Sequence, residues 1–157
     1  MPEPEDTTLL LDVMLGKLVT YLRMCGYDTA YALDRELEGD DAILACARRE
    51  GRTLVTRDVS LANATSDAVL LHSLDIEDQL RELVVAGFAL ELTEPRRCSR
   101  CNGPLERVEV DQGTPSFAPD PDEQDVWRCR DCDQPYWRGS HWDDVGRRLQ
   151  AVRRDVE

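Results

Sequence analysis

The sequence predicts an α/β domain built on a parallel sheet, followed by a small module that depends on a bound metal. Strand-like and helix-like segments alternate through the first part of the 157 residues, and that order produces parallel sheets with right-handed crossovers. The second part contains two C-x-x-C pairs and little apolar sequence. Such a module is too small to fold on its core alone, so we expect a metal to stabilise it.

The first strand is predicted at residues 9–11, and a helix follows it at once. Three consecutive leucines are typical of a strand that is covered on both faces. Apolar side chains then recur at helical spacing, at Leu15, Leu18, Val19 and Leu22. A strand followed directly by a helix therefore opens the domain.

Later elements follow from turn and cap residues as well as from apolar periodicity. Two further helices are expected to begin at acidic caps, one at Asp40 with Asp41 beside it and one at Asp75, and to end near Gly51 and Gly87. The remaining strands are predicted at residues 29–33, 53–56 and 68–71, with a further candidate at 88–92.

We expect the chain to divide into residues 1–94 and residues 95–157. The boundary is marked by Pro95 and the two arginines that follow it. Within the second unit, residues 111–125 are rich in proline and acids, which predicts a loop without regular structure. A final short helix is predicted from three apolar residues at helical spacing, Val145, Leu149 and Val152.

The chain is acidic, with a formal net charge of −13 and Lys17 as the one lysine beside eighteen arginines. Two explanations stay open: a halophile-like composition, in which carboxylates keep a protein solvated in salt, and an ordinary acidic protein from a GC-rich genome. Residues 1–94 carry eight basic and nineteen acidic side chains, whereas residues 95–157 carry eleven and thirteen. The second unit is therefore the better candidate for contact with a polyanion.

No segment of the sequence predicts a membrane partner. A bilayer span needs about 18 to 20 apolar residues in a row, and no run approaches that length. The N-terminus is acidic and lacks the basic start of a secretory signal. We therefore expect a soluble, cytoplasmic protein.

Four aspartates are predicted to gather at one edge of the sheet. Asp12 follows the first strand, Asp58 follows the third, and Asp40 and Asp41 begin the second helix. Ligands of open α/β sheets collect outside the carboxyl ends of the strands, and several carboxylates there are tolerable when Mg²⁺ or Mn²⁺ neutralises them. In the alternative interpretation, Asp40 or Asp41 only caps a helix and Asp58 only begins a turn. As a set, they predict a metal site that could activate water against a phosphodiester.

Other acidic α/β sites fit the sequence poorly. A phosphoacceptor receiver domain would need an adjacent acidic pair at the first strand end, whereas Asp12 is followed by Val13 and Met14. A haloacid-dehalogenase-like site would need D-x-D there, and position 14 is methionine.

Three basic residues accompany the aspartates and could reach phosphates near the metal. They are Lys17 and Arg23 in the first helix and Arg57 beside Asp58. The alternative is that they are ordinary surface charges.

Six cysteines fall into two groups. Cys25 and Cys46 stand alone in helical patterns and are most simply buried small apolar residues. The other four form two knuckles that can supply four thiolates to a tetrahedral Zn²⁺ ion, namely Cys98, Cys101, Cys129 and Cys132. A site with four thiolates has no open position, so we assign this zinc a structural role.

Aromatic and basic residues alternate after the second knuckle. Trp137, Arg138, His141 and Trp142 could stack on unpaired bases and contact phosphates. They could equally form the small core of the module, and the sequence does not separate these roles.

Several segments together resemble the Mut-seven carboxy-terminal RNase family, a branch of the PIN-like nucleases with an attached zinc ribbon. The segments are LDVMLGKLVTYLRMCGYD, DDAILACA, GRTLVTRDVSL, the two C-x-x-C knuckles and YWRGSHW. The resemblance implies a PIN-like three-layer α/β/α domain followed by a C-terminal zinc ribbon. It also implies metal-dependent cleavage of single-stranded RNA. The residues it implies as metal ligands are Asp12, Asp40 with Asp41 beside it, Asp58, and the four cysteines of the knuckles.

Our leading hypothesis is a metal-dependent endoribonuclease that uses Mg²⁺ or Mn²⁺ for catalysis and Zn²⁺ for structure, with RNA as its partner. Asp12, Asp40 and Asp58 would hold the catalytic ion, and the ribbon would guide RNA toward it. The alternative is an RNA- or ribosome-associated binding protein whose acidic site is vestigial.

Overall fold

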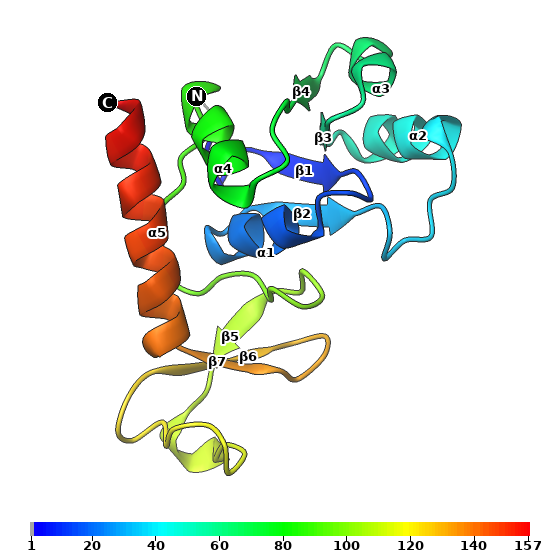
Figure 1. The fold of residues 1–157 in the computed structure, drawn as a ribbon. Helices are drawn as coiled ribbons and strands as arrows, with labels where there is room; N and C mark the ends of the chain where they lie inside the picture. The colour runs from blue at the N-terminus through cyan, green and yellow to red at the C-terminus, as the bar shows by residue number, and fades with distance from the viewer. Residues whose placement is uncertain (1) are drawn as a thin grey trace.

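A computed structural model describes residues 2–157 and shows a four-stranded parallel sheet with helices on both faces (Figure 1). The strands lie in the order β2-β1-β3-β4. They are β1 (Thr8–Leu11), β2 (Asp28–Tyr31), β3 (Thr53–Thr56) and β4 (Ala68–Leu70). The helices are α1 (Gly16–Met24), α2 (Asp40–Glu50), α3 (Val59–Asn63) and α4 (Ile76–Val85). None of the helices in residues 2–157 is both long and apolar enough to cross a membrane.

A second, antiparallel sheet lies beside the first and carries the cysteines. Its strands are β5 (Leu105–Arg107), β6 (Val126–Cys129) and β7 (Pro135–Trp137), in the order β5-β6-β7. A single 3₁₀ turn, η1 (Val110–Gln112), interrupts the loop between β5 and β6, and the long helix α5 (Ser140–Val156) ends the chain. The predicted fold class, an α/β domain with a parallel sheet plus a small cysteine-bearing module, is confirmed.

The central strand β1 has apolar side chains on both of its faces. Leu9 and Leu11 point into a core shared with α1 and α4, whereas Leu10 points into a second core formed with α2 and α3. Side chains of a strand alternate between faces, so three consecutive leucines supply both cores at once. The result is the three-layer α/β/α arrangement.

Helix α5 also contributes to the first core. Val145, Leu149 and Val152 are buried in the same cluster as Leu9 and Leu11. The helix runs alongside α4 (Figure 1), and Arg81 of α4 forms an ion pair with Asp155 at 2.8 Å. The C-terminal helix is therefore part of the packing of the first sheet, and the division of the chain at residue 94 stays a prediction.

Three local predictions were wrong. The final helix is not short, because α5 runs for 17 residues. Residues 88–92 do not form a strand: Phe88 and Leu90 are buried, but the Ala89 amide bonds the Tyr27 hydroxyl and the Pro2 carbonyl instead of a neighbouring strand. The N-cap of α2 is Gly39 and not Asp40. The backbone of Gly39 has a φ of +83°, which glycine adopts without strain and an aspartate would not.

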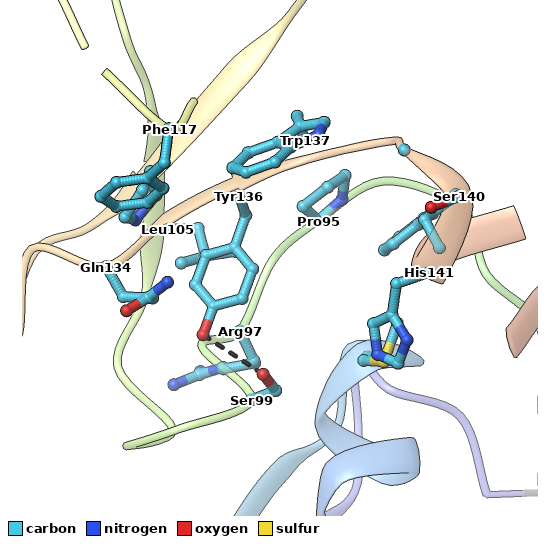
Figure 2. Close-up of a pocket in the computed structure, with 14 residues that line it drawn as sticks. Pro95, Arg97, Ser99, Leu105, Phe117, Gln134, Tyr136, Trp137, Ser140 and His141 are labelled. Carbon is cyan, nitrogen blue, oxygen red and sulfur yellow. Dashed lines mark hydrogen bonds between the residues drawn. The ribbon is translucent and has the colours of Figure 1, made fainter. Parts of the chain in front are cut away.

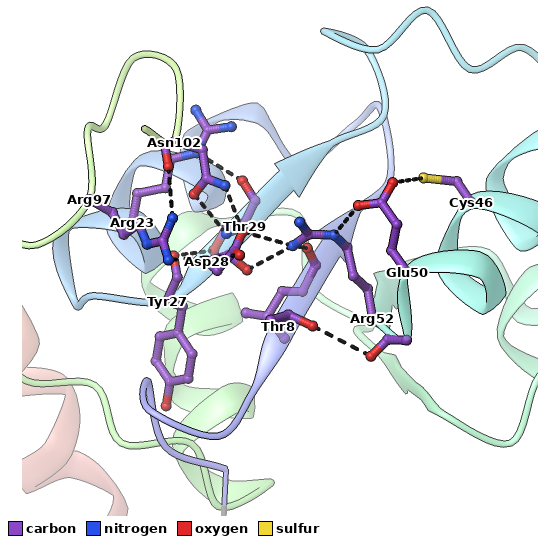
Figure 3. A network of polar contacts seen from close by, with 12 residues as sticks. Thr8, Arg23, Tyr27, Asp28, Thr29, Cys46, Glu50, Arg52, Arg97 and Asn102 are labelled. Carbon is purple, nitrogen blue, oxygen red and sulfur yellow. Dashed lines mark hydrogen bonds and ion pairs between the residues drawn. The ribbon is translucent and has the colours of Figure 1, made fainter. Parts of the chain in front are cut away.

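A polar network fastens the cysteine module to the N-terminal edge of the parallel sheet (Figure 3). Arg52 donates to the Asp28 carboxylate at 2.9 Å and to the carbonyls of Leu9 and Asp28. Asn102, in the first knuckle, donates to the same carboxylate at 2.7 Å and accepts from the Thr29 amide at 2.8 Å. Asn102 thus joins the module to the sheet through the Asp28 carboxylate and the Thr29 amide.

Glu50 belongs to this network and gives it a measurable pH dependence. Hydrogen bonds from Arg52 and then Arg35 lower the pKa of Glu50 from its ordinary 4.5 to about 2. A lowered folded-state pKa stabilises the protein above the unfolded pKa, and this contribution disappears as the pH falls toward the folded pKa.

We therefore predict that Glu50→Gln lowers the free energy of unfolding at pH 7, because it removes the charge that Arg52 and Arg35 bond. The loss should not exceed about 1 kcal/mol, because water screens such partly exposed pairs. The deficit should shrink as the pH falls below 4.5, because Glu50 of the unfolded wild type is then protonated while the folded protein gives up its stabilising charge toward pH 2. Urea unfolding at several pH values between 7 and 3 measures it. Glu38→Gln is the control, since Glu38 is exposed and forms no ion pair within residues 2–157. A deficit that is constant with pH would contradict the assignment.

Candidate active site and cysteine centre

Asp12 and Asp58 lie at the carboxyl ends of neighbouring strands and share one hydroxyl. Asp12 follows β1, Asp58 lies two residues after β3, and β1 pairs with β3. The Thr56 hydroxyl donates to Asp12 Oδ2 at 2.7 Å and accepts from the Asp58 backbone amide at 3.0 Å. Thr56 is fully buried, so its side chain has no competing water. Its single proton goes to Asp12, which fixes the direction of both bonds.

Asp12 is a buried carboxylate with hydrogen bonds but no cationic partner. Its side chain is 6% exposed, and Oδ1 accepts from the Val13 amide at 2.8 Å. Within residues 2–157 no lysine, arginine or histidine comes within ion-pair distance of it. A buried carboxylate is costly unless it is paired or coordinates a metal. Asp12 could therefore hold a cation, and its role as a metal ligand stays a prediction.

Asp58 both caps a helix and keeps one oxygen free. Oδ1 accepts from the Leu61 amide at 3.2 Å, so the helix-cap role is real. In the described structure Oδ2 has no hydrogen-bond donor. Beside it, Arg57 has a buried Nε without any partner in the described residues. The structure thus leaves one oxygen of Asp58 and the Nε of Arg57 without a protein partner at the end of β3.

Asp40 and Asp41 occupy the first turn of α2 and are exposed. Among residues 2–157, the four cysteines are the one group of three or more potential ligands whose donor atoms all lie within 4.8 Å of one another. Asp40 therefore does not share such a cluster with Asp12 and Asp58, and its role as a ligand stays a prediction.

The basic residues that were expected near phosphates differ in their surroundings. Lys17 is exposed on the first turn of α1. Arg23 is buried, 4% exposed, and donates to the carbonyls of Thr29 at 2.9 Å and Ser99 at 3.1 Å. These bonds tie α1 to the first knuckle and favour a structural role for Arg23.

Sequence reasoning missed two residues that shape this edge, Thr56 and Tyr31. The Tyr31 hydroxyl donates to the Val13 carbonyl at 2.7 Å and holds the turn that follows Asp12. Gly16 permits this contact, because a Cβ there would lie 3.0 Å from the Tyr31 oxygen. A signal for Thr56 was present in the tripeptide TRD, since a hydroxyl two residues before an acid commonly bonds its backbone.

The four cysteines converge on one point. Cys98 and Cys132 place their sulfurs 3.6 Å apart, and those of Cys101 and Cys129 are 3.4 Å apart. A disulfide would bring two sulfurs to about 2.05 Å, whereas tetrahedral Zn²⁺ with bonds of about 2.3 Å places sulfurs roughly 3.8 Å apart. The donor set and its spacing fit zinc.

Both knuckles fold in the same way. Asn102 and Asp133, which directly follow the second cysteine of each pair, adopt left-handed backbone with φ of +72° and +66°. Their amides bond the carbonyls of Cys98 and Cys129, at 2.8 and 3.0 Å. Gly103 is required next to Asn102, because a Cβ there would lie 2.8 Å from the Cys129 sulfur.

The surroundings of Cys98 favour the thiolate that a metal needs. Burial raises the pKa of this thiol, but hydrogen bonds from the Tyr136 hydroxyl and from the amides of Cys101 and Arg100 outweigh it and lower the pKa to about 7. The Tyr136 oxygen lies 2.9 Å from the sulfur.

The aromatic residues after the second knuckle have separate positions. Trp127 on β6 is the buried indole of the module, and the Arg138 guanidinium lies over its ring at 5.2 Å and near Asp125 at 3.4 Å. Trp137, His141 and Trp142 instead line one cavity of about 340 Å³ (Figure 2). The two predicted tryptophans therefore share one surface, and the core role belongs to Trp127.

In a comparison with protein-family models, residues 7–149 match the model of the Mut7-C RNAse domain. A search of curated proteins and a search of solved structures each found no match. The matched segment spans both sheets, the acidic edge and all four cysteines. The chain therefore belongs to the Mut7-C RNase domain family, a family of nucleases.

Proposed function

We propose that the protein is a metal-dependent endoribonuclease that cleaves single-stranded RNA at the edge where β1 and β3 end. Membership of a ribonuclease family supports the reaction class. The observation that carries the location is the buried carboxylate of Asp12, which has no cationic partner within residues 2–157 and shares the Thr56 hydroxyl with Asp58. The two carboxylates of this arrangement could together bind a cation.

Asp12 and Asp58 would hold Mg²⁺ or Mn²⁺, with Asp40 as the third ligand from α2. Such an ion supplies two things when bound: a water of lowered pKa and neutralisation of charge on the phosphodiester.

Thr56 acts as a positioning residue, since it fixes the rotamer of Asp12 and the backbone of Asp58 together. Asp41 is exposed beside Asp40 and can accept a proton, while Lys17 and Arg57 can contact the phosphates that flank the cut.

One observation favours a second function, binding of RNA or of a ribosomal site without cleavage. Within residues 2–157, no three of Asp12, Asp40, Asp41 and Asp58 bring their carboxylate oxygens within 4.8 Å of one another, so the acidic edge is not a closed ligand cage. A vestigial site would look the same, and the cysteine module would then supply the contact. The cleavage experiment below separates the two functions.

We further propose that the cysteine centre holds one structural Zn²⁺. The sulfur spacings fit a tetrahedral ion, and the small sheet β5-β6-β7 buries only a few large side chains, such as Trp127. For a module of this kind, the free energy of binding zinc is also its free energy of folding.

The zinc proposal predicts one tightly bound zinc per chain and selective unfolding of residues 95–142 in Cys129→Ser. The parallel sheet should stay folded, because its cores use β1, α1, α4 and α5 and none of the cysteine ligands. Elemental analysis gives the zinc content, and amide hydrogen exchange locates the unfolding. Cys46→Ser is the matched control, since Cys46 lies in α2, away from the cluster. Zinc-free protein that is fully folded would refute the proposal.

The catalytic proposal predicts that Asp12→Asn and Asp58→Asn each lower the rate of RNA cleavage by orders of magnitude, because each removes a charge that the cation needs. Asparagine caps helices as well as aspartate does, so Asp58→Asn should leave α3 intact. Gel analysis of a labelled single-stranded RNA with Mn²⁺ measures the rates, and circular dichroism checks the fold. If the Asp12→Asn protein cuts as fast as the wild type, the cleavage belongs elsewhere and the binding function is favoured.

Thr56 provides a finer test. Thr56→Val removes the hydroxyl that joins Asp12 to Asp58, and we expect the Mn²⁺ concentration for half-maximal cleavage to rise about 10- to 100-fold, as for other groups that orient metal ligands. Thr56→Ser keeps the hydroxyl and should stay close to the wild type. Equal metal requirements for the valine and serine variants would show that Thr56 does not position the ligands.

A further inference from the structure

The cavity between β7, the first knuckle and α5 is the strongest unassigned feature, and we infer that it binds one unpaired nucleobase of the RNA. The inference rests on the proposed function and adds to it the part of the substrate that is recognised. The cavity of about 340 Å³ is at the small end of the range for ligand pockets, roughly 300 to 1,000 Å³. It is therefore sized for one small planar group.

Aromatic rings form its walls. Tyr136 and Trp137 come from β7, Trp142 comes from α5, and Phe117 comes from the loop between β5 and β6. Figure 2 shows the rings of Phe117, Tyr136 and Trp137 gathered around one hollow. Phe117 is 66% exposed, so packing in a core does not account for it. The rings of Tyr136, Trp137 and Trp142 are half-buried, and aromatic rings that keep a face open to solvent are the surfaces on which unpaired bases stack.

Polar groups lie among the rings and can bond the edge of a base. The Gln134 amide, the Ser140 hydroxyl and the His141 imidazole all line the cavity (Figure 2). Gln134 Oε1 accepts from Arg100 at 3.3 Å, which leaves both of its N–H groups available as donors. The Tyr136 hydroxyl is already engaged by Cys98 and Ser99, so this residue offers its ring face alone.

The charge of the lining favours a base that is carried on a phosphate backbone over other planar ligands. Asp and Glu make up 32 of the 157 residues, yet none of them lines the cavity. The lining does include His141 and Arg97, although the Arg97 guanidinium also lies 3.8 Å from the Asp28 carboxylate. A chain of net charge −13 should repel a phosphate backbone over most of its surface, but this cavity has no acidic side chain in its lining to do so.

Helix α1 connects the cavity with the acidic edge. Met24, its last residue, lines the cavity, whereas Gly16, its first, comes four residues after Asp12. Nine helical residues span about 13 Å, and stacked nucleotides advance roughly 3.4 Å each. A base held in the cavity would thus place the strand at the acidic edge a few nucleotides away. Cleavage should then occur at a constant offset from the captured base.

Binding is tested with a labelled single-stranded RNA 12-mer and zinc-loaded protein carrying Asp12→Asn, so that slow cleavage does not interfere. Loss of one stacking ring weakens binding by about 5- to 140-fold, the equivalent of about 1 to 3 kcal/mol per base. We expect a loss in that range for Phe117→Ala, which removes an exposed ring and spares the fold. Gly139→Ala is an independent variant, because its Cβ would lie 2.8 Å from Trp137 Nε1 and displace that indole.

Val110→Ala is the matched control, since Val110 is an exposed apolar residue of the same loop and does not line the cavity. A second measurement uses wild-type protein and RNAs with one abasic position moved stepwise along the strand. Cleavage at a given bond should fall when the abasic position reaches one fixed offset from it. Equal effects at every position would overturn the inference.

Failure of this inference differs from failure of the proposed function. If the wild type cleaves RNA but Phe117→Ala and Gly139→Ala bind it as tightly as the parent, the cavity is not a base site, and a side chain of a protein partner becomes its better occupant. If affinity falls in both variants while Asp12→Asn cleaves like the wild type, the base site stands and the catalytic assignment fails.

Discussion

The contact on which the site depends is the pairing of β1 with β3 at its carboxyl end. The Asp12 amide donates to the Val55 carbonyl at 3.0 Å, which continues the ladder one residue beyond β1 and carries the acid into the protein. Burial of β1 between two apolar cores fixes that register, because a slip of one residue would bring Thr8 or Asp12 into a core position that a leucine now fills. Thr56 then completes the arrangement through its hydroxyl. The chemistry of this edge is therefore a consequence of how the sheet packs.

A second constraint fixes the cysteine module against the sheet. Arg23 reaches from α1 to the Ser99 carbonyl, and Asn102 reaches back to Asp28 and Thr29. Helix α5 continues the attachment by placing Val145, Leu149 and Val152 in the first core. These contacts hold the cavity at one end of α1 and the acidic edge at the other. Asn102 adopts left-handed backbone in the first knuckle, where its amide bonds the Cys98 carbonyl. Zinc bound by the knuckles would therefore also stabilise the contacts of Asn102 with the sheet.

The sequence was informative where a residue type has one physical use. Three leucines predicted a strand with two buried faces, Asp75 predicted a helix start, and two C-x-x-C pairs predicted a shared centre.

The sequence was uninformative where the outcome depends on distant partners. Phe88 and Leu90 look like a strand, but no strand within residues 2–157 pairs with them. Helix α3 is too short for its periodicity to be seen. Arg23 looks like a surface charge because Thr29 and Ser99, which receive its hydrogen bonds, are not apparent as partners. The cavity brings together residues from five separate segments, which no local pattern could predict.

The central claim is that a buried, unpaired carboxylate at the end of β1 exists to bind a divalent cation. Titration of zinc-loaded protein with Mn²⁺, followed by electron paramagnetic resonance of the free ion, counts the bound manganese directly. The account predicts that the wild type and the control Asp143→Asn, an exposed residue of α5, bind the ion, and that Asp12→Asn loses it while remaining folded. Equal manganese binding by the wild type and Asp12→Asn would contradict the account, whether or not the protein cleaves RNA.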